Sequence, residues 1–193
     1  MARIGFKKAK YNQHDNATGK YKALVGSKVP DFEKVVDEAF SANYANAELY
    51  ANDGLAEHDD SFIDGTLTIT IADDRDEFVA EIMGNTITTG EVVQKETDIA
   101  PELGYGHIIP KVYGGERKYK VEFFPRVRFT KITSDNKTKG NAVEFATSSL
   151  EAKVMRLESE FNGIPAGVWE KHKTFDSLTE AETYLDGLLT PSA

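Results

Sequence analysis

An acidic cluster in the first third of the chain contains the residue types that could do chemistry. The stretch AELYANDGLAEHDDSFIDGTLTITI, residues 47–71, places six ionisable side chains between two strand-like runs. They are Asp53, Glu57, His58, Asp59, Asp60 and Asp64. Clustered carboxylates can bind Ca²⁺ or Mg²⁺, and a carboxylate beside a histidine can serve in acid–base catalysis. The same residues could also form a solvated loop against which a partner docks.

The spacing of this cluster departs from the known calcium-binding pattern. An EF-hand loop begun at Asp60 would place Asp64 and Gly65 correctly, but Phe62 and Ile71 would occupy two ligand positions. The chain's four histidines are far apart in sequence and form no HExxH motif. The sequence therefore favours a solvated loop. The alternative is a small carboxylate-based metal-dependent hydrolase that would use Asp53, Glu57, His58 and Asp60.

Motifs for nucleotide binding and for nucleophilic catalysis are missing from the sequence. The stretch GYGHI has glycines at 104 and 106 but isoleucine at 109, and it joins no strand to a helix. No P-loop and no GxSxG motif occurs. The basic, aromatic stretch 111–129 could bind single-stranded nucleic acid. However, Tyr119 and Val121 alternate with lysines there, which is typical of a strand with one buried and one solvated face.

The composition indicates a single domain that folds without covalent crosslinks. The chain has 193 residues and no cysteine, which excludes disulfides, thiolate zinc sites and cysteine nucleophiles. With 23 basic and 32 acidic residues the net charge is −9, which argues against a protein that grips nucleic acid. We expect neither a signal peptide nor a membrane-spanning segment, because no run of about 18 apolar residues occurs.

Hydrophobic periodicity predicts a mainly β (α+β) fold with two helices. In GTLTITI, residues 65–71, apolar residues alternate with threonines, which predicts a half-buried strand. A short helix is expected over 73–84, with Asp74 as N-cap and Gly84 at its end. The pair Gly114-Gly115 predicts a hairpin turn. A final helix is expected over 177–189, with Ser177 and Glu180 as a capping box.

Several segments, taken in order, resemble a known family. They are ARIGFKKAKY, AELYANDGLAE leading into GTLTITIADDRDEFVAEIMG, GHIIPKVYGGERKYKVEFFPRVRF, and NAVEFATSSLEAKVM. In this order they are similar to the major tail protein, or tail tube protein, of long non-contractile-tailed bacteriophages, and in particular to the phi13-type family. The resemblance covers most of residues 1–157. LYANDG and FATSSLEAKVM are its most telling segments.

The resemblance implies a structural virion protein with no catalytic activity and no cofactor or metal. Its fold would be a β-sandwich or barrel with a short flanking helix and a C-terminal helix, in one domain spanning residues 1–193. Six copies would form a ring, and stacked rings would make the tail tube through which DNA passes without specific binding. Tape measure, tail terminator and distal tail proteins would be partners, and assembly would take place in the host bacterial cytoplasm. The tube of a contractile injection device or a type VI-like secretion apparatus is the alternative.

The resemblance also suggests roles for the acidic residues. Residues 41–64 are expected to form a long loop that becomes ordered against neighbouring subunits. Its candidate contact residues are Asp53, Glu57, His58, Asp59, Asp60 and Phe62. Glu33, Asp37 and Glu48 are candidate lumen-facing acids, since a negative channel would repel DNA phosphates. From about residue 160 a C-terminal extension is expected, in which Trp169 is either an interface anchor or a packed residue.

Overall fold

The computed structural model describes residues 2–3, 5–51, 54–134 and 147–192. The predicted mainly β fold is confirmed, with two α-helices, α1 (Asp76–Met83) and α2 (Leu178–Leu189), and a short 3₁₀ helix (Val25–Ser27). No described helix is long and apolar enough to cross a membrane. The strands are β1 (Ala2–Arg3), β2 (Lys8–Asp15), β3 (Lys20–Tyr21), β4 (Val35–Tyr44), β5 (Ala47–Ala51), β6 (Gly54–Asp59), β7 (Phe62–Ile71), β8 (Thr86–Thr88), β9 (Glu91–Val93), β10 (Leu103–Tyr113), β11 (Glu116–Ser134), β12 (Ser148–Val154) and β13 (Lys171–Phe175).

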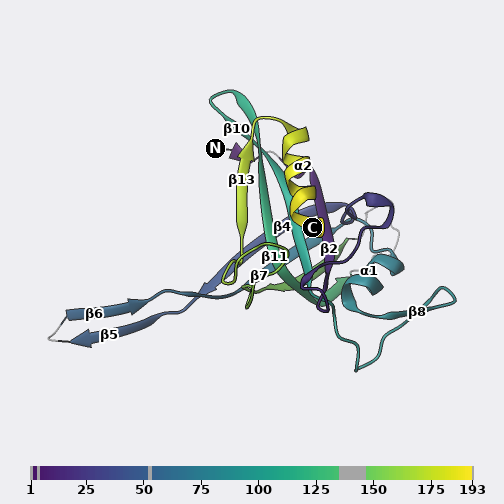
Figure 1. Ribbon diagram of the computed structural model, residues 1–193, viewed down its shortest axis with the longest axis horizontal. Helices are drawn as coiled ribbons and strands as arrows, with labels where there is room; N and C mark the ends of the chain where they lie inside the picture. The colour runs from purple at the N-terminus through teal and green to yellow at the C-terminus, as the bar shows by residue number, and fades with distance from the viewer. Residues whose placement is uncertain (1, 4, 52–53, 135–146, 193) are drawn as a thin grey trace, which may run out of the picture.

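One long strand, β11, joins the two halves of the main sheet (Figure 1). The strand order is β3-β2-β10-β11-β12-β7-β4, with β1 added beside β10 and β13 beside β11. The first part of β11 pairs with β10 and β13, whereas its last part, from Val127 to Ser134, pairs with β12. We call β3-β2-β10-β11-β13 the first half-sheet and β11-β12-β7-β4 the second half-sheet.

Two hydrophobic clusters hold the fold together. The first lies between the half-sheets and combines residues such as Tyr105 and Phe124 with Leu67 and Leu150. The second lies between the first half-sheet and α2, where Leu185 packs against strand residues. The first half-sheet is thus covered on both faces, because β10 and β11 bury side chains on either side. The segment after residue 160 contributes to both clusters, Phe161 and Ile164 to the second and Trp169 to the first, so it is packed into the domain.

The local predictions for β7 and for the hairpin are confirmed. Leu67, Ile69 and Ile71 are fully buried, while the threonines between them are partly exposed. Gly114 and Gly115 form the turn between β10 and β11, with φ of 59° and 87°. Both values lie in the left-handed region that only glycine enters without strain.

The predicted start of the first helix is wrong, although its end is right. The helix α1 begins at Asp76 with Arg75 at the N-cap and no side-chain capping bond. The Asp74 carboxylate instead accepts hydrogen bonds from the hydroxyls of Ser148, at 2.6 Å, and Ser134, at 3.2 Å. Hydrogen bonds from two serines distant in the chain therefore take the place of the N-cap contact expected for Asp74. Gly84 ends α1 in the left-handed conformation, as predicted.

The predicted loop 41–64 is largely β-structure. β4 continues to Tyr44, β5 and β6 pair antiparallel from Ala47 with Asp59 to Ala51 with Gly54, and β7 begins at Phe62. We call residues 45–61 the arm, described except at 52–53; in Figure 1 it projects far from the body of the protein. Its polar composition suggested a loop, but a hairpin that projects into solvent has no core face and therefore shows no apolar alternation.

Candidate functional site

The acidic cluster lies on the arm and does not converge to one point. His58 is opposite Glu48 and Glu57 is opposite Leu49, so neighbouring β6 side chains point to opposite faces of the hairpin. The Asp59 carboxylate accepts the backbone N–H of Ser61 at 2.9 Å. Asp53 falls outside the described residues. Among those described, no three histidine or acidic side chains are grouped so that they could hold a metal ion. The described residues of the cluster therefore form no metal site of the kind that the hydrolase alternative requires.

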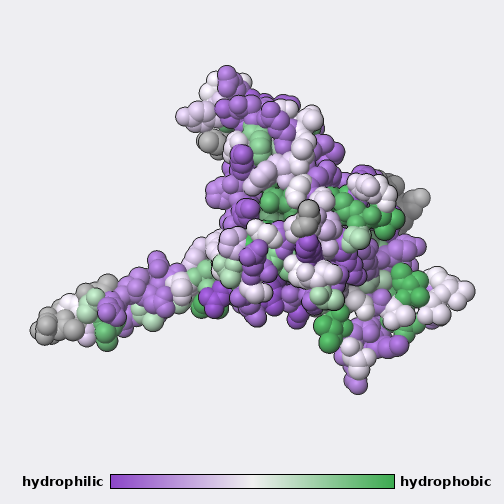
Figure 2. Space-filling view, in the orientation of Figure 1, coloured by the Kyte–Doolittle hydropathy of each residue, from purple (hydrophilic) through white to green (hydrophobic). Residues whose placement is uncertain are grey.

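The arm carries charge and exposed apolar groups together. Its described acids are Glu48, Glu57, Asp59 and Asp60. Leu49 and Tyr50 are 57% and 65% exposed. Figure 2 shows hydrophilic residues along most of the arm, with hydrophobic ones near its base and near its end. An exposed hairpin with this mixture is typical of a surface that contacts another protein.

The base of the arm is closed by hydrogen bonds between the strands that carry it. The N–H of Ala45 donates to the carbonyl of Ser61 at 2.7 Å, and the amide of Asn43 donates to the Asp64 carboxylate at 2.5 Å. Phe62 lies here, in the first position of β7, and packs toward the body with Tyr44. Phe62 is therefore part of the arm's anchor, while the other candidate contact residues that are described project from it.

The three candidate lumen acids lie in three different surroundings. Glu33 forms an ion pair with Arg75, next to α1. Asp37 lies on β4 opposite Thr70. Glu48 lies on the arm, where it accepts the hydroxyl of Tyr50 at 2.7 Å. The three acids do not lie together, because the chain turns from the body into the arm between Asp37 and Glu48. Their place at a channel stays a prediction.

The second half-sheet has a hydroxyl-rich face that sequence reasoning missed. It is the face of β4, β7, β12 and the end of β11 opposite the first hydrophobic cluster, as the strand register shows. Its hydroxyl residues are Ser41, Thr66, Thr68, Thr70, Thr133 and Ser149, and its charged residues are Asp37, Asp64, Arg128, Lys131, Glu151 and Lys153. Three acids and three bases give 3 − 3 = 0 net charge. The alternating threonines of β7 indicate a polar face in the sequence. Only the strand register shows which residues of β4, β11 and β12 lie on that face beside them.

Both edges of the second half-sheet are open within the described residues. β4 pairs with β7 alone, and beyond Val127 the strand β11 pairs only with β12. Open strand edges present unpaired N–H and C=O groups and favour pairing with another chain. This half-sheet therefore combines two open edges with a polar outer face.

A polar cavity of about 600 Å³ lies where β4 meets β10 and β11. The buried ring of His107 lies between two carboxylates there, with Nδ1 3.2 Å from Glu38 Oε1 and Nε2 3.2 Å from Glu122 Oε2. Tyr105 donates its hydroxyl to Glu38 at 2.6 Å. Burial disfavours ionisation of Glu122, but hydrogen bonds from His107 and Lys120 outweigh it and hold the pKa of that carboxyl far below its ordinary value. These groups tie the edge strand β4 to the first half-sheet.

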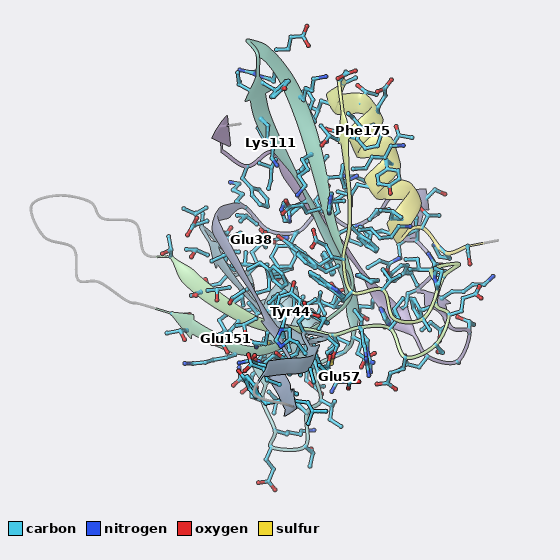
Figure 3. All side chains as sticks on the ribbon, turned by 90° about the vertical axis from the view of Figure 1, so that its left-hand side faces the viewer. Glu38, Tyr44, Glu57, Lys111, Glu151 and Phe175 are labelled. Carbon is cyan, nitrogen blue, oxygen red and sulfur yellow. The ribbon has the colours of Figure 1, made fainter. Side chains whose placement is uncertain are left out.

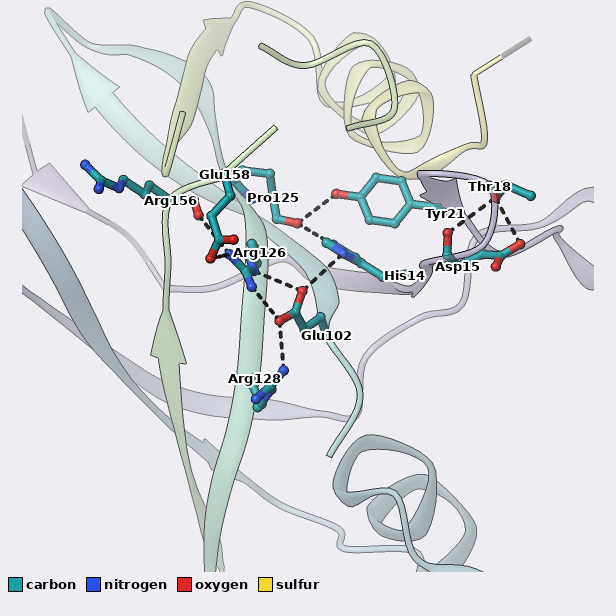
Figure 4. A network of polar contacts seen from close by, with 10 residues as sticks. All are labelled: His14, Asp15, Thr18, Tyr21, Glu102, Pro125, Arg126, Arg128, Arg156 and Glu158. Carbon is teal, nitrogen blue, oxygen red and sulfur yellow. Dashed lines mark hydrogen bonds and ion pairs between the residues drawn. The ribbon is translucent and has the colours of Figure 1, made fainter. Parts of the chain in front are cut away.

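A second polar network holds the place where β11 passes from one half-sheet to the other (Figure 4). Arg126 donates two hydrogen bonds to Glu102, at 2.8 and 2.9 Å, and Arg128 donates a third at 2.8 Å. Burial raises the pKa of the Glu102 carboxyl, but the two guanidinium groups outweigh this and lower it. The carbonyl of Pro125 accepts His14 Nε2–H at 2.8 Å and the Tyr21 hydroxyl at 3.0 Å. Most partners in the network bind one another, while Arg128 Nε is buried without a hydrogen-bond partner among the described residues. The network thereby fixes the position of β11 between the half-sheets.

No family model matches the chain, and no curated protein matches it significantly.

Proposed function

We propose that the protein is a structural subunit that polymerises into the tail tube of a long non-contractile-tailed phage. Copies join through the open edges of the second half-sheet into hexameric rings, and the rings stack. The observation that carries this proposal is that half-sheet itself, whose two edges are unpaired among the described residues and whose outer face is polar. Closing such sheets into a ring pairs every edge, which removes the aggregation hazard of an open strand.

In the proposed ring the hydroxyl-rich face lines the channel. A surface that DNA must pass without sticking should carry no excess of basic groups, since each unpaired cation would attract phosphate. The balanced charge of this face meets that requirement. Lys153, for example, lies 3.5 Å from Asp64 and donates to the hydroxyl of Thr66 at 3.2 Å. The proposal replaces Glu33 and Glu48 as lumen candidates and keeps Asp37.

In this proposal the two half-sheets, with the first hydrophobic cluster between them, form the β-sandwich of tail tube proteins. The protein then resides in the virion after assembly in the host bacterial cytoplasm. Its other partners are a tape measure protein inside the tube and terminator or distal tail proteins at the ends. The arm contacts neighbouring copies, which explains why it extends so far from the body of its own chain.

Negative-stain electron microscopy of the purified, tag-free protein at high concentration tests the proposal. We expect stacked rings or hollow tubes. A matched variant replaces residues 47–59 with a single glycine, which removes both strands of the arm and leaves its hydrogen-bonded base at Ala45 and Ser61. That variant should remain folded and fail to form long tubes. A full-length protein that stays monomeric throughout would contradict the proposal, and normal tubes from the shortened variant would exclude the arm from assembly.

A further inference from the structure

The hairpin between β10 and β11 ends in a basic surface, although the chain as a whole is acidic. We call residues 111–118 the basic tip. It holds Lys111, Arg117 and Lys118 against Glu116, a net charge of 3 − 1 = +2, in a chain of net charge −9. Tyr113, in the same tip, is 60% exposed. The tip therefore presents cations around an exposed aromatic ring.

The register of the tip places two of these cations side by side. Lys111 pairs directly with Lys118, so both side chains lie on the same face of the hairpin. Like charges at directly opposed positions of an antiparallel pair are destabilising. Lys118 finds a counter-charge at 2.8 Å in Asp176, but that carboxylate is 83% exposed and contributes little. An acidic partner that approached the tip would add counter-charge at this place.

The arm has the complementary chemistry. Residues 45–61 contain no lysine or arginine. Its described acids therefore give a charge of −4 with histidine neutral. Leu49 and Tyr50 supply exposed apolar surface beside them, as Tyr113 does on the tip. Opposite charges steer two surfaces together and fix their orientation, while the aromatic groups supply contact area.

The arm and the tip of one copy do not meet. In Figure 1 the arm and the β10–β11 hairpin point away from the body in different directions. The view in Figure 3 agrees, since Glu57 on the arm and Lys111 near the tip lie at well-separated heights. A contact between these surfaces must therefore join two copies. Because the surfaces differ, the contact is heterologous and can repeat from copy to copy without end unless it closes into a ring.

We propose that the acidic arm of one copy docks on the basic tip of another copy. Carboxylates of the arm, with Glu57 and Asp60 as representatives, surround the end of the tip, where Arg117 lies on one face of the hairpin and Lys118 on the other, and Leu49 and Tyr50 pack beside Tyr113. This inference rests on the proposed function, because it requires that copies of the chain associate. It adds the surface on which the arm docks.

Charge reversal with rescue tests the contact. The arm variant is E57K/D60K, whose two wild-type side chains take part in no described hydrogen bond, and the tip variant is R117E/K118E. A matched control, E91K/E96K, makes the same charge change near the exposed β8–β9 hairpin. Self-association is measured by sedimentation velocity at low and high salt, and circular dichroism checks that each variant is folded. Binding of labelled DNA is measured in parallel.

We expect each reversal alone to weaken association by about 10-fold or more, and the combination to restore most of it, because the ion pairs then form with exchanged signs. The control should behave like the wild type, and salt should weaken wild-type association. Failure of the combination to recover, or an unaffected tip variant, would overturn the inference while leaving the tube proposal standing. Rescue without hollow tubes would support the inference and count against the tube.

Two further outcomes would also overturn the inference. Loss of DNA binding in R117E/K118E with unchanged self-association would assign the tip to nucleic acid. A wild-type protein that never associates would exclude both this contact and the proposed assembly.

Discussion

The indole of Trp169 lies flat against the ring of Phe62, with the ring centroids 4.3 Å apart and the planes within 6°. Phe62 opens β7 at the base of the arm, whereas Trp169 lies in the segment before β13. Phe40 of β4 stacks on the same indole at 5.8 Å. The C-terminal segment thus packs against both strands that carry the arm, at the place where the arm leaves the body, and we call this stack of Phe40, Trp169 and Phe62 the clamp.

This clamp predicts a measurable coupling between the two rings. F62A and W169A should each destabilise the fold by about 2–4 kcal/mol, since each loses packed aromatic area. The double variant should reveal a coupling of about 0.5–1.5 kcal/mol, as for other aromatic pairs. Urea unfolding followed by circular dichroism provides the free energies. Y50A, which removes an exposed ring further along the arm, should stay within about 0.5 kcal/mol of the wild type. Strictly additive effects of F62A and W169A would contradict the clamp.

Gly106 is predicted to be essential for packing α2 on the sheet. A Cβ at this position would lie 2.5 Å from Leu185 Cδ1 and 3.2 Å from the carbonyl oxygen of Glu122. G106A should therefore lower the free energy of unfolding by about 1–3 kcal/mol through overpacking. G187A is a matched control on α2 itself, where a Cβ would have no neighbour within 4 Å. It should stabilise the helix by about 0.5–1 kcal/mol. Equal melting temperatures for the two variants would show that the close approach is unimportant.

The network at Glu102 predicts acid sensitivity. The pKa of the Glu102 carboxyl is lower in the folded state than in the unfolded state. The carboxylate therefore stabilises the fold fully at any pH above its unfolded pKa, and this contribution is lost as the pH falls through its folded pKa. E102Q should cost about 1–3 kcal/mol at pH 7, because two guanidinium groups lose a charged acceptor. Its melting temperature should also fall less steeply than that of the wild type between neutral and acidic pH. E158Q removes a 79% exposed partner of the same Arg126 and should behave nearly like the wild type. Parallel pH profiles for E102Q and the wild type would contradict this role.

The proposed channel face predicts a size limit on chemical labelling. Because the chain contains no cysteine, T68C on the hydroxyl-rich face and T179C on α2 each create a single thiol. In assembled tubes a small maleimide should label both. A large polymer-linked maleimide should label only T179C, since the channel excludes it. In the monomer the two reagents should label both positions, which controls for intrinsic reactivity. Labelling of T68C in tubes by the large reagent would place that face outside.

The sequence by itself determined the elements whose signal is local. The alternation of Leu67, Ile69 and Ile71 with threonines specified β7 and its buried face, and Gly114-Gly115 specified a hairpin turn. The apolar spacing over 177–189 specified the last helix, whose Ala181 and Leu185 are buried as that pattern requires. In each case the period of the backbone and the freedom of glycine at positive φ act within a few residues.

Tertiary structure alone decided where polar side chains find their partners. Asp74 looked like a helix cap, yet it binds Ser148, which lies 74 residues further along the chain. Gly106 belongs to a glycine pair that fits no nucleotide-binding motif, yet it makes room for Leu185. The polar arm looked like a loop, because a hairpin without a core shows no alternation. The hydroxyl-rich face exists only through the register of strands that are far apart in sequence, since a local pattern carries no information about which strand lies beside which.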